Sequence, residues 1–203
     1  MEIKDNKTGV PLEHYIGRFS EEDPMDMSRR SGVPYDRDGK FRLSLMGRPV
    51  AVSWPGMESV YEDDGSPTAS NIRILLGRLL LGGMLLGHGE KMLAYNEFPW
   101  GNVYLQQFRG RCVMRLAGSY GRSLESFSEA CKRVGGREAE GGDIAFDIPF
   151  LPKLTVRFLL WEGDEEFPPS AQALFSENFQ FAFTAEDMAV VGDIIINAMK
   201  GSW

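Results

Sequence analysis

Alternating apolar and polar residues mark two segments of the chain as β-hairpins. Residues 41–54 form the first, with a reversal at Gly47-Arg48, and residues 143–161 form the second, with a turn at Leu151-Pro152-Lys153. A period of two residues is typical of strands that bury one face, and glycine or proline between two such runs indicates the turn. We therefore expect antiparallel pairing within each hairpin.

Apolar residues spaced three or four positions apart predict helices elsewhere. The longest are expected at residues 67–81, 102–117, 124–134 and 185–199, and shorter ones at residues 12–18, 24–30 and 168–175. Several of these segments begin with residues that cap helices, namely Asp23-Pro24, Ser66-Pro67, Ser123 and the capping box Thr184–Asp187. These signals place both ends of most of the expected helices.

Together these elements predict an α+β protein made of a single domain over residues 1–203. We expect the two hairpins to form one mainly antiparallel sheet of about four to six strands, packed on one face by about four to five helices. Residues 1–10 are mostly polar and are expected to be flexible. With 203 residues, of which 43% are hydrophobic, the chain can bury a sizeable core.

Charge is unevenly distributed along the chain. The net charge is −7, yet residues 70–137 hold ten basic and four acidic side chains, whereas residues 138–203 hold three basic and twelve acidic ones. Either these stretches lie side by side and neutralise each other, or the basic stretch binds an anion or a partner. The candidate residues for such binding are Arg109, Arg111 and Arg115 of one predicted helix, and His88 in the Gly82–Gly89 loop. A negative total field, without a basic stripe that holds exposed aromatic residues, argues against nucleic acid.

Other classes of protein are also disfavoured by the sequence. No apolar run reaches the roughly 18 residues that span a bilayer, since the longest covers residues 74–81 and contains Gly77 and Arg78. Residues 1–8 carry no apolar segment like that of a secretory signal, so we expect a cytoplasmic protein without membrane association. No Walker A motif or dinucleotide-binding glycine pattern occurs, and we expect no cofactor.

Cysteine and histidine chemistry also finds little support. The only cysteines, Cys112 and Cys131, fall on the apolar sides of predicted helices, so we expect both to be buried. The only histidines, His14 and His88, lie far from them along the chain, and nothing in their spacing points to a metal site.

One dense polar segment follows the last strand of the second hairpin. Glu162, Asp164, Glu165 and Glu166 come directly after Trp161, with Asp143 at the start of the paired strand. Clustered carboxylates could hold a divalent cation, or one could act as a general acid or base after its neighbours raise its pKa. They could instead pair with Arg109, Arg111 and Arg115, or simply be solvated. Pairing is the interpretation that we favour, and we predict no metal site.

Several strings together resemble one bacterial and archaeal domain-of-unknown-function family, over about residues 12 to 199. They are Ser31–Asp36, Leu45–Pro49, Gly142-Asp143, Trp161–Ser170, Ala173–Phe175 and Thr184–Asp187. One departure is Ser176, where the family often has aspartate. The family occurs in anaerobes, alone or fused to iron–sulfur or corrinoid-protein modules. The resemblance implies an accessory role near one-carbon metabolism and supplies no catalytic residues.

Three functions remain open from the sequence. The leading one is a non-catalytic accessory module that binds a partner protein, such as a corrinoid or iron–sulfur protein, or a small anionic ligand. The second is a metal-assisted or acid/base enzyme that uses the carboxylates of residues 162–166. The third is a subunit of an assembly, with Trp100 and Trp203 as exposed interface residues.

Overall fold

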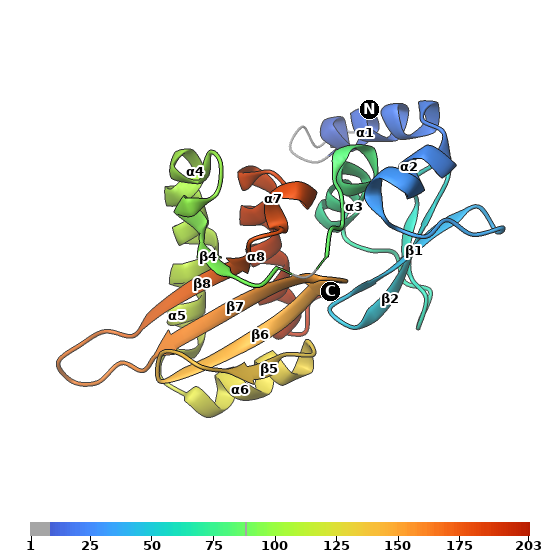
Figure 1. The fold of residues 1–203 in the computed structure, drawn as a ribbon. Helices are drawn as coiled ribbons and strands as arrows, with labels where there is room; N and C mark the ends of the chain where they lie inside the picture. The colour runs from blue at the N-terminus through green and yellow to red at the C-terminus, as the bar shows by residue number, and fades with distance from the viewer. Residues whose placement is uncertain (1–8, 88) are drawn as a thin grey trace, which may run out of the picture. The chain divides into compact units, whose positions relative to one another are not determined.

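The computed structural model describes residues 9–87 and 89–203, which form two compact units. The first unit holds the chain up to Leu86 together with Phe181–Phe183, and the second holds Gly87–Gln180 and Thr184–Trp203. Both contain helices and antiparallel strands (Figure 1), so the α+β class is confirmed. The single domain over residues 1–203 stays a prediction. Residues 1–8 of the segment that we expected to be flexible lie outside the described residues.

The first unit combines three helices with a three-stranded sheet in the order β1-β2-β3. Its elements are α1 (Gly9–Glu21), α2 (Pro24–Ser31), β1 (Lys40–Leu45), β2 (Arg48–Ser53), β3 (Ser59–Tyr61) and α3 (Ser70–Gly82). Both α1 and α2 pack on α3. The predicted hairpin over residues 41–54 is confirmed. Its reversal lies one residue earlier than expected, at Met46-Gly47, where both φ angles are positive (48° and 83°) as a type I′ turn requires.

The start of α3 differs from the prediction. The helix begins at Ser70 and has no side-chain cap, although Ser66-Pro67 had suggested an earlier start. Residues 66–68 instead pair with β3. Tyr61 N–H donates to Ser66 O and Thr68 N–H donates to Ser59 O, each at 2.9 Å. These backbone hydrogen bonds hold residues 66–68 beside the strand.

The second unit contains a five-stranded antiparallel sheet in the order β4-β8-β7-β6-β5. Its strands are β4 (Met92–Ala94), β5 (Arg137–Ala139), β6 (Ile144–Leu151), β7 (Leu154–Trp161) and β8 (Ser170–Ser176). Its helices are η1 (Tyr95–Glu97), α4 (Gly101–Phe108), η2 (Arg109–Val113), α5 (Met114–Tyr120), α6 (Leu124–Arg133), α7 (Phe179–Ala182) and α8 (Ala185–Met199), and the last two residues of α7 belong to the first unit.

The two hairpins do not share a sheet, so the predicted single sheet of four to six strands is wrong. The hairpin over residues 143–161 is confirmed as β6 and β7, but it pairs with β5 and β8. The segment that we expected to form a helix over residues 168–175 is β8, whose Phe175 pairs with Val156 of β7 and with Leu93 of β4. This strand extends the sheet beyond the hairpin.

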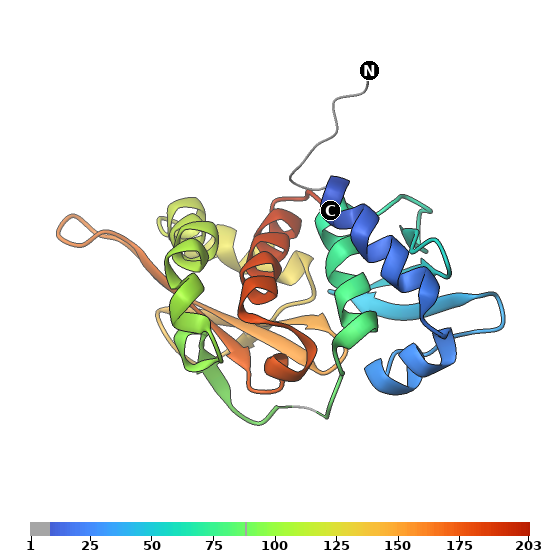
Figure 2. The same ribbon diagram turned by 90° about the horizontal axis from the view of Figure 1, so that it is seen from above.

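The helices of the second unit cover one face of its sheet, as predicted (Figure 2). Phe146, Ile148 and Phe158 face them and are fully buried. Asp147 and Arg157 lie on the opposite face, where two side-chain hydrogen bonds of 2.7 and 2.9 Å join them. Predicted caps are confirmed at Ser123 for α6 and at Thr184–Asp187 for α8. In the part of the chain that the structure describes, no helix is long and apolar enough to cross a membrane.

Candidate functional site

The longest helical stretch in the second unit runs through α4, η2 and α5 and includes a π-helical segment. The sequence predicts a helix over residues 102–117 because Tyr104, Phe108, Cys112 and Leu116 recur at intervals of four. Steps of four overshoot an α-helical turn by about 40° each. The wider turn of η2 absorbs this drift. Phe108, Cys112 and Leu116 therefore all stay on the buried side.

The π-helical segment places two arginines on the exposed side of the helix. Phe108 and Cys112 point inward, so the residues between them are directed away from the core. Arg109, Gly110 and Arg111 are all exposed. Arg109 and Arg111 thus lie on either side of Gly110 in the sequence, all three away from the buried Phe108 and Cys112. In the described ranges 9–87 and 89–203, neither Arg109 nor Arg111 forms an ion pair.

The third predicted arginine serves a different purpose. Arg115 forms an ion pair with Asp193, and its guanidinium donates to the side-chain oxygen of Asn197 at 2.8 Å. Both partners lie on α8, so Arg115 fastens α5 to that helix. Of the four residues expected to bind an anion or a partner, Arg109 and Arg111 are thus exposed and unpaired, and His88 lies outside the described residues.

A strained turn precedes α4 and exposes a tryptophan. Gly101 N–H donates to Phe98 O at 2.9 Å, and Trp100 lies in the left-handed region with φ 65° and ψ 4°. These angles belong to the third residue of a type II turn, where glycine or asparagine is usual. Trp100 nevertheless occupies it and is 77% exposed. A bulky residue held in this conformation, with its ring in solvent, is typical of a functional position.

Two more apolar side chains extend this surface along the helix. Val103 is 61% exposed and Met114 is 69% exposed. Together with Trp100, Arg109, Gly110 and Arg111 they form what we call the outer helix face. Neither Val103 nor Met114 was predicted from the sequence. The available signal was that both residues fall on the side of the helix opposite the buried Phe108 and Cys112.

The acidic segment forms a loop, residues 162–167, between β7 and β8, which projects from the sheet (Figure 1). Asp164 accepts hydrogen bonds from the backbone N–H groups of Glu166 and Phe167 at 2.8 and 2.7 Å. These bonds hold the pKa of the Asp164 carboxyl below its usual value. At the base of the loop, Asp143 accepts a hydrogen bond from the backbone N–H of Glu162 at 2.9 Å. Two of the five predicted carboxylates thus close the turn.

Chemistry at this loop gains no support from the geometry. A general acid at neutral pH needs a raised pKa, whereas the pKa of Asp164 is lowered. Glu162, Glu165 and Glu166 are exposed to solvent. Among the residues with described positions, no group of three or more histidine, cysteine, aspartate or glutamate side chains is placed to hold a metal ion.

The predicted pairing of the acidic loop with the arginines of the helix is wrong. Gly163 N–H donates to Gly121 O at 2.9 Å, which anchors the loop just after the last residue of α5. Arg111 lies ten residues earlier, about 15 Å away along a helix. Over the described residues, no ion pair joins the carboxylates of Glu162–Glu166 to an arginine. Phe167 at the end of the loop is 67% exposed.

Both cysteines are buried, as predicted, and neither is suited to catalysis. Cys112 lies against Gly192 of α8, and Cys131 lies on the buried side of α6. Burial raises the pKa of the Cys112 thiol to about 12 and raises the pKa of the Cys131 thiol as well. The reactive form of a thiol is the thiolate, so both groups are inert in the folded protein.

This burial predicts slow thiol labelling. We expect Ellman's reagent at pH 8 to leave both thiols of the native protein unmodified, since a thiol with a pKa near 12 is ionised in about one molecule in 10,000 at that pH. In denaturant both thiols should react fully. Because an unfolded thiol ionises near pH 8.5, the stabilisation from the protonated thiols should be complete below about pH 8 and decline as the pH rises further. Denaturant titrations should therefore show a lower free energy of unfolding at pH 10 than at pH 7. Rapid native labelling would contradict the buried placement.

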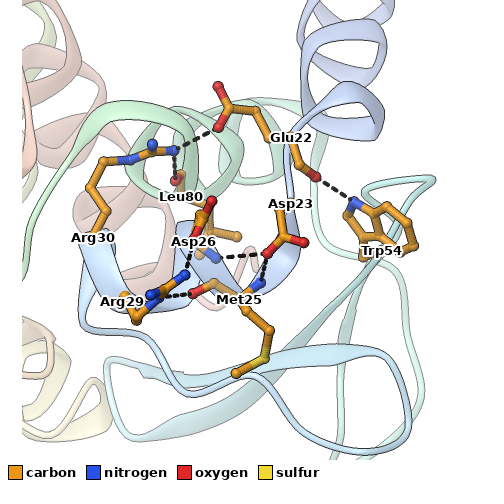
Figure 3. A network of polar contacts seen from close by, with 8 residues as sticks. All are labelled: Glu22, Asp23, Met25, Asp26, Arg29, Arg30, Trp54 and Leu80. Carbon is orange, nitrogen blue, oxygen red and sulfur yellow. Dashed lines mark hydrogen bonds and ion pairs between the residues drawn. The ribbon is translucent and has the colours of Figure 1, made fainter.

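Polar contacts in the first unit are structural. Asp23 accepts hydrogen bonds from two backbone N–H groups in the first turn of α2, at 2.9 and 3.0 Å (Figure 3). Arg30, at the other end of α2, pairs with Glu22 and donates to Leu80 O of α3, each at 3.3 Å. Trp54 Nε1 donates to Glu22 O at 3.2 Å. The network joins the turn between α1 and α2 to α3 and to the end of β2, so it fixes these elements in place.

Trp203, the other predicted interface residue, is less exposed than Trp100. Trp203 is only partly exposed, whereas the prediction treated both tryptophans as exposed. Trp100 is therefore the aromatic residue that contributes to the outer helix face.

Fold and surface together describe an α+β protein with an exposed, partly apolar and partly basic helix face. A family model described as a domain of unknown function, DUF3786, matches residues 23–198, so the chain belongs to that family. At residue 176, where the resemblance led us to expect aspartate, the Ser176 hydroxyl is buried and accepts a hydrogen bond from Thr155 N–H at 3.1 Å. A search of curated proteins and a search of solved structures each found no match.

Proposed function

We propose that this chain is a non-catalytic accessory module that docks a protein partner on the outer helix face. The observation that carries the proposal is Trp100, a large aromatic residue held in a left-handed conformation with most of its surface in solvent. Tryptophan and arginine are enriched among the residues that dominate binding at protein interfaces. Here Trp100 lies directly before α4, and the two arginines lie in η2 of the same helical stretch.

A protein fits this face better than a small anion does. Besides Arg109 and Arg111, the face holds three exposed apolar side chains, which a small anion would leave in water. The apolar residues from Trp100 to Met114 extend over about 20 Å of helix. A surface of this length, with three exposed apolar side chains and two exposed arginines, suits a partner with an acidic surface and an exposed apolar side chain.

The resemblance noted from the sequence suggests which partner to test first. It implies an accessory role in one-carbon metabolism, in the cytoplasm, with a corrinoid or iron–sulfur protein as the partner. The proposal makes these proteins the first class for reconstitution once the chain has been shown to dock a protein.

Site-directed photo-crosslinking tests the proposal. A photo-reactive phenylalanine analogue placed at Val103 in cells should capture a discrete protein, whereas the same analogue at exposed Glu125 of α6 should not. Trp100→Gly should reduce the Val103 product at least tenfold, as expected for a residue that dominates an interface. Equal capture from both sites, or no loss with Trp100→Gly, would contradict the proposal.

The glycine variant also separates binding from folding. Glycine adopts the left-handed conformation without steric cost, so Trp100→Gly should leave the free energy of unfolding unchanged or raise it by up to about 1 kcal/mol. Denaturant titration of the purified protein checks this. A lower stability would mean that the tryptophan supports the fold, and the crosslinking result would then carry no weight.

A further inference from the structure

We infer that, when no other partner is bound, the outer helix face of one copy takes the acidic loop of a second copy. The inference rests on the proposed function, because it uses the same face and names its occupant. The helix face offers Arg109 and Arg111, and the loop offers Glu162, Glu165 and Glu166, all exposed. Opposite charges on two surfaces of one molecule favour association between copies.

Both surfaces also carry apolar side chains. Phe167 ends the acidic loop and is 67% exposed, and Trp100, Val103 and Met114 are exposed on the helix face before and after the arginines. The hydrogen bonds from Glu166 and Phe167 N–H to Asp164 fix the backbone that carries the phenylalanine. A loop already held in its conformation loses little entropy on binding.

Contact within one copy is excluded by the anchor of the loop. The hydrogen bond from Gly163 to Gly121 O holds the base of the loop beyond the C-terminal end of α5. Arg109 and Arg111 lie between ten and twelve residues earlier, about 15 to 18 Å along the helix. The loop of a second copy can reach them when the two α4–η2–α5 stretches run antiparallel. Each copy then gives one loop and receives one, so the pair closes as a two-fold dimer.

Sedimentation velocity on the whole chain tests the inference. At 50 mM salt we expect a dimer, and at 500 mM salt a monomer, because salt screens pairs of exposed charges. The double variants Arg109→Glu/Arg111→Glu and Glu165→Lys/Glu166→Lys should each be monomeric at 50 mM salt. Mixing the two should restore a heterodimer, since the reversed surfaces complement each other.

A matched control separates this contact from net charge. The variant Glu125→Lys/Glu129→Lys on α6 changes the net charge as much as Glu165→Lys/Glu166→Lys does, also at exposed positions of the second unit. It should remain a dimer at 50 mM salt. Thermal melts should show that all three variants are folded. A wild-type monomer at 50 mM salt, or charge variants that neither dissociate nor complement each other, would overturn the inference.

The outcome also distinguishes this inference from the proposed function. If the wild-type chain is monomeric while the analogue at Val103 captures a different protein, self-association is wrong and the docking function stands. If that analogue captures neither a second copy nor another protein, both are wrong.

Discussion

Phe175→Ala is expected to lower the free energy of unfolding by about 3 to 5 kcal/mol, the usual cost of removing a buried phenylalanine ring. Phe175 is fully buried at the centre of an aromatic cluster. Its ring centroid lies 5.0 Å from that of Phe179, 5.8 Å from Phe108, 6.2 Å from Phe98 and 6.3 Å from Tyr95. Rigid aromatic rings make up much of its surroundings, so a cavity should remain. Denaturant titration measures the loss.

Phe167→Ala is the matched control for this substitution. It removes the same atoms from a residue that is 67% exposed, and the free energy of unfolding should change by less than about 0.5 kcal/mol. If the two variants lost similar stability, Phe175 would not be at the centre of the core, and the placement of β8 would be wrong.

Gly192→Ala is expected to destabilise the protein by about 1 to 3 kcal/mol, although alanine favours helices more than glycine does. A Cβ atom at Gly192 would come within 2.8 Å of Cys112 Sγ and 3.0 Å of Cys112 Cβ. Helix α8 and the π-helical segment must therefore move apart or repack. A lower denaturation midpoint with an unchanged slope would show the loss of stability.

Gly118→Ala, in α5, is expected to stabilise the protein instead. Nothing lies within 4 Å of a Cβ atom at Gly118 of α5. The variant should therefore gain about 0.5 to 1 kcal/mol from the better helix propensity of alanine. A stabilised Gly192→Ala variant would contradict the close approach of α8 to η2, and a destabilised Gly118→Ala variant would contradict the open space at Gly118.

Local signals explain which elements could be predicted from the sequence. Helix α2 carries Asp23 and Pro24 at its start, and α8 carries the Thr184–Asp187 capping box, so a few neighbouring residues determine each boundary. The hairpin of β6 and β7 also depends on neighbours in sequence, since the turn joins strands that alternate strongly. Such elements need no information from distant parts of the chain.

The misassigned elements depend on distant pairing. Residues 170–176 contain no β-branched residue, and Pro168-Pro169 resembles a helix start. They form β8 because β7 and β4 supply backbone partners on both sides. Strands β3, β4 and β5 have three residues each, which is too short to show a period.

The candidate site was only partly predictable for a related reason. Arg109 and Arg111 were identified by charge, and Trp100 by residue type, but their common face depends on the π-helical segment and on the turn at Trp100. The expected ion pairs failed because Arg115 finds Asp193 on α8, a residue 78 positions away in the chain. The charge composition shows that acidic residues are available to the arginines, but it does not show which of them form ion pairs.

The five-stranded sheet ends on both sides in short strands, and this has a consequence for its behaviour at high concentration. Strands β4 and β5 have only three residues each, and β5 also carries the exposed Arg137 and Glu138. Long, flat, uncharged edge strands are the places where other protein chains add to a sheet and start fibrils. The short outer strands of this sheet, with charges on β5, therefore disfavour that route of polymerisation.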